Sequence, residues 1–242
     1  MLRAVCVSLL FVFPLAAQEA KKPASIVPAP RKDKGWQDRH EKFVAQSKAG
    51  NVDVAFIGDS ITQGWEGNGK QAWAKEFAPL KSGNYGIGGD QTQHVLWRIT
   101  EGKELEGISP KVAVMMIGTN NTRNSNADEI AAGVEAIIKE LRKQKPELKI
   151  ILLAVFPRTT VFNPPKDKVS AGELMTKINE INERIAKFGH DKNVFYMDIN
   201  KVFLDDDGGM SKSIMYDYLH LSPKGYERWA EAILPKVKEL LK

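Results

Sequence analysis

The stretch that decides the fold is Val54-Ala-Phe-Ile-Gly-Asp-Ser-Ile-Thr-Gln-Gly-Trp65, in which a short apolar run stops at a glycine and a serine follows at once. Residues 52–57 are mostly β-branched or apolar, as a buried central strand requires. A serine just past such a strand, with a helix starting beside it, exposes its hydroxyl and leaves its backbone N–H free to donate. Ser60 therefore has the position of a nucleophile, although Asp59 and Ser60 would equally suit the cap of a helix.

The same design recurs along the chain, because apolar runs that predict strands alternate with amphipathic segments that predict helices. Strands are expected at residues 52–57, 112–117, 150–155 and 194–197, and helices at residues 36–47, 70–77, 94–99, 127–143, 171–188 and 222–241. These strands show no polar alternation, so both faces of the sheet must be covered. This indicates an α/β fold with a parallel sheet in a three-layer α/β/α sandwich, built as a single domain over residues 36–242.

The first 35 residues differ from the rest in composition. Residues 1–17 have the pattern of a secretory signal peptide, with Arg3 before an apolar run and small residues up to Ala17, and the run is too short to span a membrane. Cleavage there predicts a secreted or periplasmic protein and removes the one cysteine, Cys6, which excludes disulfides and thiolate metal sites. Residues 18–35, rich in proline and basic side chains, are expected to be a flexible leader.

Charge and motif content exclude several function classes. The net charge of +5 comes from lysines and arginines spread over the expected helix faces, without the interleaved aromatics of a nucleic-acid-binding stripe. There is no H-E-x-x-H and no clustered acidic and histidine set, so no metal is expected. The glycines at 86, 88 and 89 are too closely spaced for a dinucleotide fingerprint, so no cofactor is expected either.

A serine hydroxyl becomes a useful nucleophile when an imidazole, itself held by a carboxylate, takes its proton. Only His220 follows an aspartate at a suitable spacing, in Asp217-Tyr-Leu-His220, where one turn of chain brings the carboxylate to Nδ1 and leaves Nε2 for the serine. His40, His94 and His190 are interpreted as structural or surface residues. An isolated D-x-x-H also occurs as a surface ion pair, so both interpretations stay open on this motif alone.

Acyl transfer also needs hydrogen-bond donors for the oxyanion that forms during the reaction. The candidates are the backbone N–H of Ser60, a backbone N–H from Gly88-Gly89, and the side-chain amide of Asn120. In a parallel sheet the loops after the strands emerge at one edge, so these groups are expected to converge there. Taken singly, the glycines and the asparagine are also ordinary turn residues.

Four blocks of the sequence together resemble the SGNH hydrolases, the GDSL-type esterases and lipases. The blocks are Gly58-Asp-Ser60-Ile, Asn84-x-Gly86-x-x-Gly89, Gly118-x-Asn120 and Asp217-x-x-His220, in the family's order, and the resemblance runs from about residue 52 to residue 240. Within this family, residues 84–98 and 118–121 look like the catalytic α subunits of platelet-activating factor acetylhydrolase, type Ib.

The resemblance implies a role for each matching residue. It implies a catalytic set made of Ser60 as nucleophile, His220 as base and Asp217 as its orienter. It implies an oxyanion hole made of the Ser60 N–H, the Gly89 N–H and Asn120. Asp59 and Asn84 are supporting residues of the motifs. A flavodoxin-like sheet of five strands in the order 2-1-3-4-5, without a cofactor, and a possible homodimer are also implied.

Two features depart from the family. Ile61 stands where the family's name has leucine, which keeps an apolar side chain. The predicted signal peptide is the second departure. The acetylhydrolase subunits that the sequence resembles are intracellular and act with a regulatory partner.

The sequence therefore predicts a secreted serine esterase that removes short acyl groups, foremost acetyl, from a small molecule or polysaccharide by a Ser-His-Asp acyl-enzyme mechanism, with carbohydrate deacetylation as the favoured reaction. The alternatives are a lipid acylhydrolase and a binding module of the same fold that holds a polysaccharide or lipid head group without hydrolysis. No long apolar lid is present to favour long-chain lipids. An α/β-hydrolase is excluded because Ser60 lacks the second glycine of G-x-S-x-G.

Overall fold

Five parallel strands form the central sheet, in the order β2-β1-β3-β4-β6. The computed structural model describes residues 22–159, 168–169 and 173–242. The strands of the sheet are β1 (Val54–Gly58), β2 (Ser82–Gly86), β3 (Val112–Met116), β4 (Lys149–Leu153) and β6 (Val194–Met197). Neighbouring strands pair in parallel throughout. The predicted order 2-1-3-4-5 is confirmed, since β6 is the fifth strand of this sheet.

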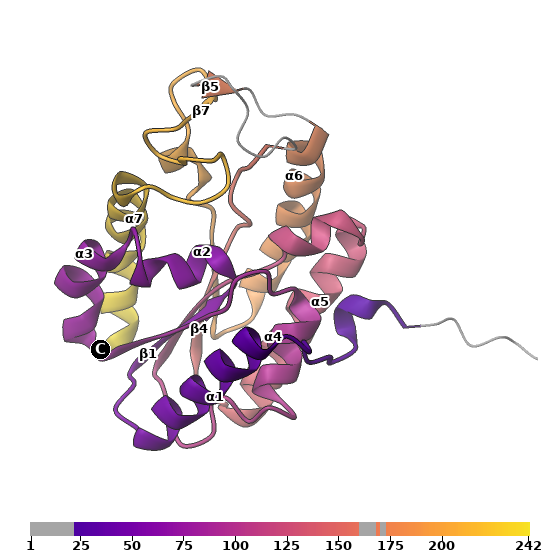
Figure 1. Ribbon diagram of the computed structural model, residues 1–242, viewed down its shortest axis with the longest axis vertical. Helices are drawn as coiled ribbons and strands as arrows, with labels where there is room; N and C mark the ends of the chain where they lie inside the picture. The colour runs from indigo at the N-terminus through magenta and orange to yellow at the C-terminus, as the bar shows by residue number, and fades with distance from the viewer. Residues whose placement is uncertain (1–21, 160–167, 170–172) are drawn as a thin grey trace, which may run out of the picture.

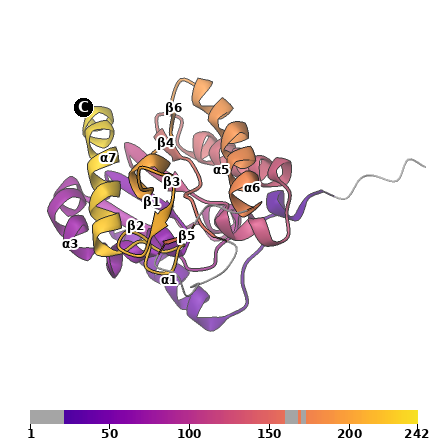
Figure 2. The same cartoon turned by 90° about the horizontal axis from the view of Figure 1, so that it is seen from above.

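Helices cover both faces of the sheet (Figure 1), and the view from above places α3 and α7 on one side and α5 and α6 on the other (Figure 2). The α-helices are α1 (Lys34–Ala49), α2 (Ser60–Gln63), α3 (Lys70–Ala72), α4 (Thr92–Ile99), α5 (Ala127–Gln144), α6 (Glu173–Ala186) and α7 (Pro223–Leu241). Shorter helical turns are η1 (Ala24–Ile26), η2 (Gly64–Glu66), η3 (Trp73–Phe77), η4 (Ala78–Leu80), η5 (Thr119–Arg123), η6 (Lys187–His190) and η7 (Asn200–Phe203). A small antiparallel pair is made by β5 (Lys168–Val169) and β7 (Met210–Ser211). The three-layer α/β/α sandwich is therefore confirmed.

Alternate residues of each strand supply two separate cores. On β1, Ala55 and Ile57 join the core under α1, α4, α5 and α6, whereas Val54 and Phe56 join the core under α3 and α7. All four side chains are fully buried. Burial on both faces is the reason why the strands read as unbroken apolar runs.

Strand β2 is the one that the apolar pattern does not predict. It reads Ser82-Gly-Asn-Tyr-Gly86 and lies at the edge of the sheet, where other chain segments approach its backbone closely. A Cβ on Gly86 would lie 2.2 Å from the backbone nitrogen of Gln63, so no side chain fits there. Tyr85 is buried, and its hydroxyl lies 3.0 Å from Ser47 Oγ. Only the family resemblance pointed to this fifth strand.

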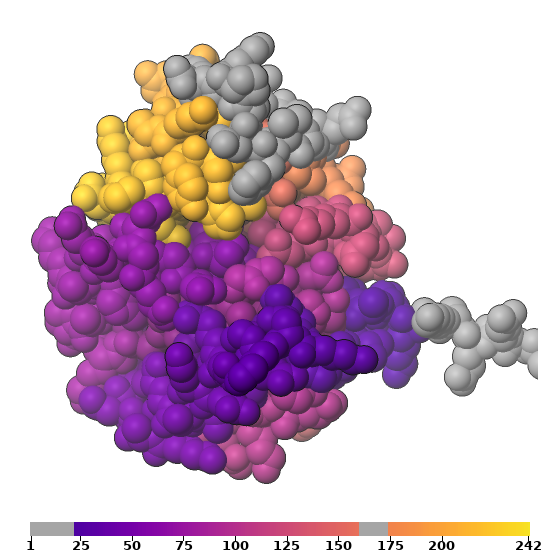
Figure 3. All heavy atoms as spheres, viewed as in Figure 1, coloured from indigo at the N-terminus to yellow at the C-terminus, as the bar shows by residue number. Residues whose placement is uncertain are grey.

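The sequence predicted a flexible leader at residues 18–35, but its described part, residues 22–35, packs on the domain. Ser25 is fully buried and donates from Oγ to the backbone carbonyl of Glu129 at 2.6 Å, while Thr92 Oγ1 donates to the Ser25 carbonyl at 2.9 Å. Figure 3 shows the described N-terminal residues, in indigo, lying against the domain surface. Proline and lysine are typical of linkers, and the composition held no sign that one serine would be buried.

Two predictions fall on parts of the chain outside the described residues. These are the signal peptide at residues 1–17 and most of the loop expected at residues 157–170, and both stay predictions. Among the described helices, none combines the length and the apolar character needed to cross a membrane.

Candidate active site

Ser60 is the first residue of α2 and follows the end of β1 directly. Asp59 caps this helix, because its Oδ1 accepts the Ile61 N–H at 2.9 Å. A Cβ on Gly58 would lie 2.2 Å from Thr62 Oγ1 and 2.5 Å from a backbone carbonyl of β3, so only glycine allows this turn. Both sequence interpretations of the stretch therefore hold: Asp59 is a cap, and Ser60 presents its hydroxyl beyond the strand.

The structure brings Ser60 against His220, 160 residues further along the chain. Ser60 Oγ lies 2.9 Å from His220 Nε2, and Asp217 Oδ2 lies 2.6 Å from His220 Nδ1. The other carboxylate oxygen, Asp217 Oδ1, accepts the backbone N–H groups of Leu219 at 3.0 Å and His220 at 2.6 Å. The turn that carries the histidine thus also holds the carboxylate in place.

Asp217 determines which ring nitrogen of His220 carries the proton. A carboxylate beside Nδ1 makes Nδ1 the N–H donor, so the neutral ring turns the lone pair of Nε2 toward Ser60. The side chain of His220 is 24% exposed and that of Asp217 is 7% exposed, so the carboxylate is shielded while the base faces the site. A serine, an imidazole and a carboxylate linked in this way can carry out acyl transfer.

Donors for an oxyanion surround Ser60 at the carboxyl ends of β1, β2 and β3. Within the described residues, the backbone N–H groups of Ser60 and Gly89 make no hydrogen bond. Asn120 donates one amide hydrogen to the Asp90 carbonyl at 3.0 Å, which leaves its second hydrogen available. A Cβ on Gly88 would lie 3.7 Å from Ser60 Cβ, so this loop lies against the candidate nucleophile. The predicted donors are thus in one cluster.

Asn84 belongs to the framework of the site. Its Nδ2 donates to the Thr62 carbonyl at 3.1 Å, and its Oδ1 accepts the Gly86 N–H at 2.9 Å. These bonds join the end of β2 to α2, the helix that begins at Ser60. The side chain is therefore committed to holding the two loops together.

The other three histidines lie outside this hydrogen-bonded series. His40 is buried, with Nδ1 3.1 Å from Glu104 Oε2. His94 Nδ1 accepts the Gln91 N–H at 3.0 Å, and burial lowers the pKa of His94 to about 4. His190 is exposed. Their contacts agree with the structural and surface roles that the sequence indicated.

Asp59 lies next to the candidate nucleophile in a fully buried place. Burial raises the pKa of Asp59 to about 7, and the charge of Asp90 adds to this, against the opposing effects of the Ile61 N–H and of Arg158. Asp59 Oδ2 has no hydrogen-bond partner among the described residues. A neutral carboxyl tolerates such a place better than a charged one.

We expect Asp59→Asn to flatten the dependence of stability on pH. The carboxyl ionises near pH 4 in the unfolded chain and near pH 7 in the folded protein, so rising pH between these values removes stability from the wild type. From pH 5 to pH 7 the wild type should lose about 2 kcal/mol more than the variant. Urea unfolding at pH 5, 6, 7 and 8 measures this, with exposed Asp198→Asn as the control. Parallel curves for wild type and Asp59→Asn would contradict the buried titration.

Arg98 is a residue of this region that sequence reasoning missed. Its fully buried guanidinium donates to the backbone carbonyls of Tyr85 at 3.0 Å and Gly58 at 3.3 Å. It also pairs with Asp90 at 2.9 Å and Glu104 at 2.6 Å. One side chain thus connects the ends of β1 and β2 with the loop after β2. An arginine inside an apolar helix was the available clue, since a buried cation needs acidic partners.

Tyr216 was also missed, and it lies beside the candidate base. Its side chain is 48% exposed, and its ring is stacked on that of His220 with centroids 6.1 Å apart at 21°. A large aromatic ring left in water beside a reactive group offers a flat apolar surface to a ligand. Its position in the sequence gave no indication of this exposure.

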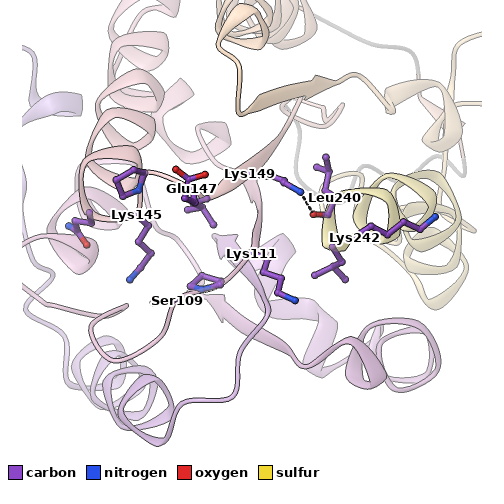
Figure 4. Close-up of a pocket in the computed structure, with 12 residues that line it drawn as sticks. Ser109, Lys111, Lys145, Glu147, Lys149, Leu240 and Lys242 are labelled. Atoms are coloured by element: carbon purple, nitrogen blue, oxygen red, sulfur yellow. Dashed lines mark hydrogen bonds between the residues drawn. The ribbon is translucent and has the colours of Figure 1, made fainter.

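A hollow of about 490 Å³ at the opposite end of the sheet lies apart from this site. Its lining includes four lysines, Lys111, Lys145, Lys149 and Lys242 (Figure 4). Lys145 and Lys149 each donate from Nζ to a backbone carbonyl at 2.6 Å, so two of the four ammonium groups are already committed. No histidine lines the hollow, so it holds no counterpart of the Ser60 arrangement.

A five-stranded α/β/α sandwich with serine, glycine, asparagine and histidine gathered at its strand ends defines an acylhydrolase of the GDSL class. The chain belongs to the GDSL-like lipase/acylhydrolase family, which it matches over residues 56–228, and it is a carboxylic ester hydrolase. The family indicated by the four sequence blocks is therefore confirmed.

Relatives of the chain include subunits of one named enzyme. The chain is 37% identical over 228 residues to platelet-activating factor acetylhydrolase IB subunit alpha2 of Rattus norvegicus, covering 93% of this chain and 94% of the relative. It is 38% identical over 209 residues to the alpha1 subunit of Homo sapiens, covering 86% and 85%. A solved structure of a GDSL-like lipase from Bacteroides thetaiotaomicron shares the fold, with a TM-score of 0.65 at 20% identity over 83% of this chain and 97% of that one.

Proposed function

We propose that the protein hydrolyses short-chain esters, foremost acetyl esters, through an acyl-enzyme formed on Ser60. The observation that carries the proposal is the series from Asp217 through His220 to Ser60, with links of 2.6 and 2.9 Å. A serine whose base and orienter both lie at hydrogen-bond distance is activated for attack on an ester carbonyl.

The reaction follows from this geometry in two halves. His220 Nε2 takes the proton of Ser60 while Oγ bonds to the carbonyl carbon, and the carbonyl oxygen becomes an oxyanion. The N–H groups of Ser60 and Gly89 and the amide of Asn120 stabilise this charge, each donor contributing about 3 kcal/mol. The alcohol then leaves with the proton from His220, and water repeats the sequence to release the acid. Asp217 keeps the imidazolium oriented through its contact with Nδ1.

The leaving alcohol in this proposal is a carbohydrate hydroxyl, as in an acetylated polysaccharide. Tyr216 supports it, because its exposed ring beside His220 offers a flat apolar surface where the alcohol takes up its proton. A lipid acetyl ester is the second candidate, favoured by similarity to platelet-activating factor acetylhydrolase subunits.

The variant Tyr216→Ala tests whether the Tyr216 ring binds the sugar or instead affects catalysis in general. We expect KM for acetylated xylan to rise about 5- to 10-fold, because loss of the ring removes about 1–1.4 kcal/mol of contact. The rate on 4-nitrophenyl acetate should stay within about twofold, and Tyr216→Trp should keep the wild-type KM. Initial-rate assays on both substrates measure this. An equal loss of activity on the two substrates would contradict a role of the Tyr216 ring in binding the sugar.

The hydrolytic proposal itself is tested with the purified mature chain. We expect turnover of 4-nitrophenyl acetate and, after treatment with a fluorophosphonate, one label per chain, located at Ser60 by mass spectrometry. A binding module without catalysis would hydrolyse no ester and take no label. Acetylated xylan, acetylated amino sugars and esters of rising acyl length, assayed side by side, then identify the substrate class.

Export and self-association complete the proposal. The composition of residues 1–17 supports a secreted or periplasmic protein, and N-terminal sequencing of the exported chain should begin at Gln18. The proposal includes a homodimer, as the family resemblance of the sequence implies, and sedimentation at micromolar concentration would detect it.

A further inference from the structure

The loop between β2 and α4 is held by an arginine from the N-terminal segment. Arg31 Nη1 donates to the Gly88 carbonyl at 2.6 Å and lies 3.6 Å from Asp90 Oδ1, and Arg31 Nε pairs with Asp33 at 3.0 Å. The Arg31 side chain is 29% exposed, so it is sheltered from water but not buried. Two carboxylates therefore aim its guanidinium at the carbonyl of Gly88.

That carbonyl belongs to the central peptide of a tight turn over residues 87–90. Asp90 N donates to the Ile87 carbonyl at 3.2 Å, and Gly89 has a φ of 79°, which is the pattern of a type II turn. Type I and type II turns differ by a flip of about 180° in the central peptide. With glycine at both central positions, both orientations are sterically open. Contacts from outside the turn must therefore select one of them.

The orientation of this peptide decides where the Gly89 N–H points. A trans peptide carries its C=O and its N–H on opposite sides. Because Arg31 holds the Gly88 C=O, the Gly89 N–H is directed away from the guanidinium. The preceding peptide is fixed as well, since Gln63 Oε1, from α2, accepts the Gly88 N–H at 2.7 Å. Both backbone groups of Gly88 are thus held by side chains, and the Gly89 N–H stays free.

We propose that Arg31 is a positioning residue that selects the turn conformation in which the Gly89 N–H completes the oxyanion hole. The inference rests on the proposed function, since it concerns the donor for the oxyanion formed at Ser60. Arg31 acts through the Gly88 carbonyl and does not touch the ester. The segment before α1, anchored by the Ala29 N–H on a backbone carbonyl of α4 at 3.2 Å, is therefore part of the framework of the site.

Arg31→Met tests this by removing the donor while keeping an unbranched side chain. We expect kcat for 4-nitrophenyl acetate to fall about 10- to 100-fold with KM within about twofold. Loss of one oxyanion donor costs about 10²- to 10³-fold, and only part of the population flips. The Ki of a trifluoromethyl ketone, which forms a tetrahedral adduct on the serine, should rise by the same factor. Arg31→Lys should recover part of the activity, because an ammonium can still donate to the carbonyl.

Arg228→Met is the matched control, since Arg228 Nη1 also donates to a backbone carbonyl, that of Val202 at 2.8 Å, between α7 and η7. It should keep the wild-type kcat and Ki. If the wild type is active and Arg31→Met keeps both values, the inference is overturned while the proposed function stands. If the fall in kcat is fully explained by a smaller number of active sites, as titrated with a fluorophosphonate, then Arg31 supports folding only. The inference is overturned in that case too. A wild type without esterase activity would instead reject the proposed function.

Discussion

Ser60→Ala is expected to lower kcat/KM for 4-nitrophenyl acetate by about 10⁴- to 10⁶-fold. Without Oγ no acyl-enzyme can form, and His220, although still held by Asp217, has no hydroxyl to deprotonate. The residual rate comes from the oxyanion donors acting on direct attack by water. Initial-rate kinetics and phosphonate labelling measure the two consequences of the same change.

Two further variants sharpen this result. His220→Ala should cost about as much as Ser60→Ala, and the double variant little more than either alone, because the two groups act as one unit. Ser82→Ala is the control, since the Ser82 Oγ makes no hydrogen bond among the described residues and lies at the start of β2. A Ser60→Ala protein that keeps a tenth or more of the wild-type rate would place the nucleophile elsewhere.

Arg98→Met is expected to lower the free energy of unfolding by about 3–5 kcal/mol. The substitution fills much of the same space but leaves buried Glu104 without the Arg98 cation, and it leaves buried Asp90 with the Arg31 guanidinium at 3.6 Å in place of the Arg98 contact at 2.9 Å. It also removes a donor from the backbone carbonyls of Tyr85 and Gly58. Removing the central cation of a buried charged network costs far more than losing a surface ion pair. Urea unfolding at pH 7.5 measures the difference.

Exposed Arg184→Met is the matched control for Arg98. Arg184 pairs with Asp128 at 2.6 Å, with the two side chains 32% and 79% exposed, so its loss should cost less than about 1 kcal/mol. The penalty of Arg98→Met should also shrink toward pH 5. Burial raises the pKa of Asp90 to about 6 even against the opposing charge of Arg98, so without that cation the carboxyl protonates more readily. A penalty below 1 kcal/mol at pH 7.5 would contradict the role given to this buried network.

The strands that the sequence predicted are those buried on both faces. Residues 112–117 and 150–155 could be recognised because a continuous apolar run has no stable place outside a core. Edge strand β2 escaped recognition because glycine and asparagine meet the backbone of α2 there, and such contacts leave no periodic pattern. The packing of the N-terminal segment could not be predicted for a similar reason, since one buried residue, Ser25, accounts for much of that packing.

The residues of the candidate site likewise fall into those that the sequence indicated and those that it did not. Ser60, Asp217 and His220 could be proposed as candidates from the sequence, because a serine after a strand and a carboxylate–imidazole pair are local patterns with definite chemistry. Arg98, Arg31 and Tyr216 were not, since their importance depends on what surrounds them and not on their own neighbours in the chain. Burial of Arg98 is the reverse of what its residue type suggests, and Tyr216 is one of two large hydrophobic side chains exposed among the described residues.

The sequence by itself determined the parallel sheet, the turn at Gly58 and the candidate residues of the site, because apolar periodicity and short motifs are properties of neighbouring residues. Only the tertiary structure decided that His220 meets Ser60 at 2.9 Å, that Asp59 is buried with a raised pKa, and that Arg31 holds the Gly88 carbonyl. The physical reason is that distances, burial and hydrogen bonds between remote segments arise from packing the whole chain, and no local stretch encodes them alone.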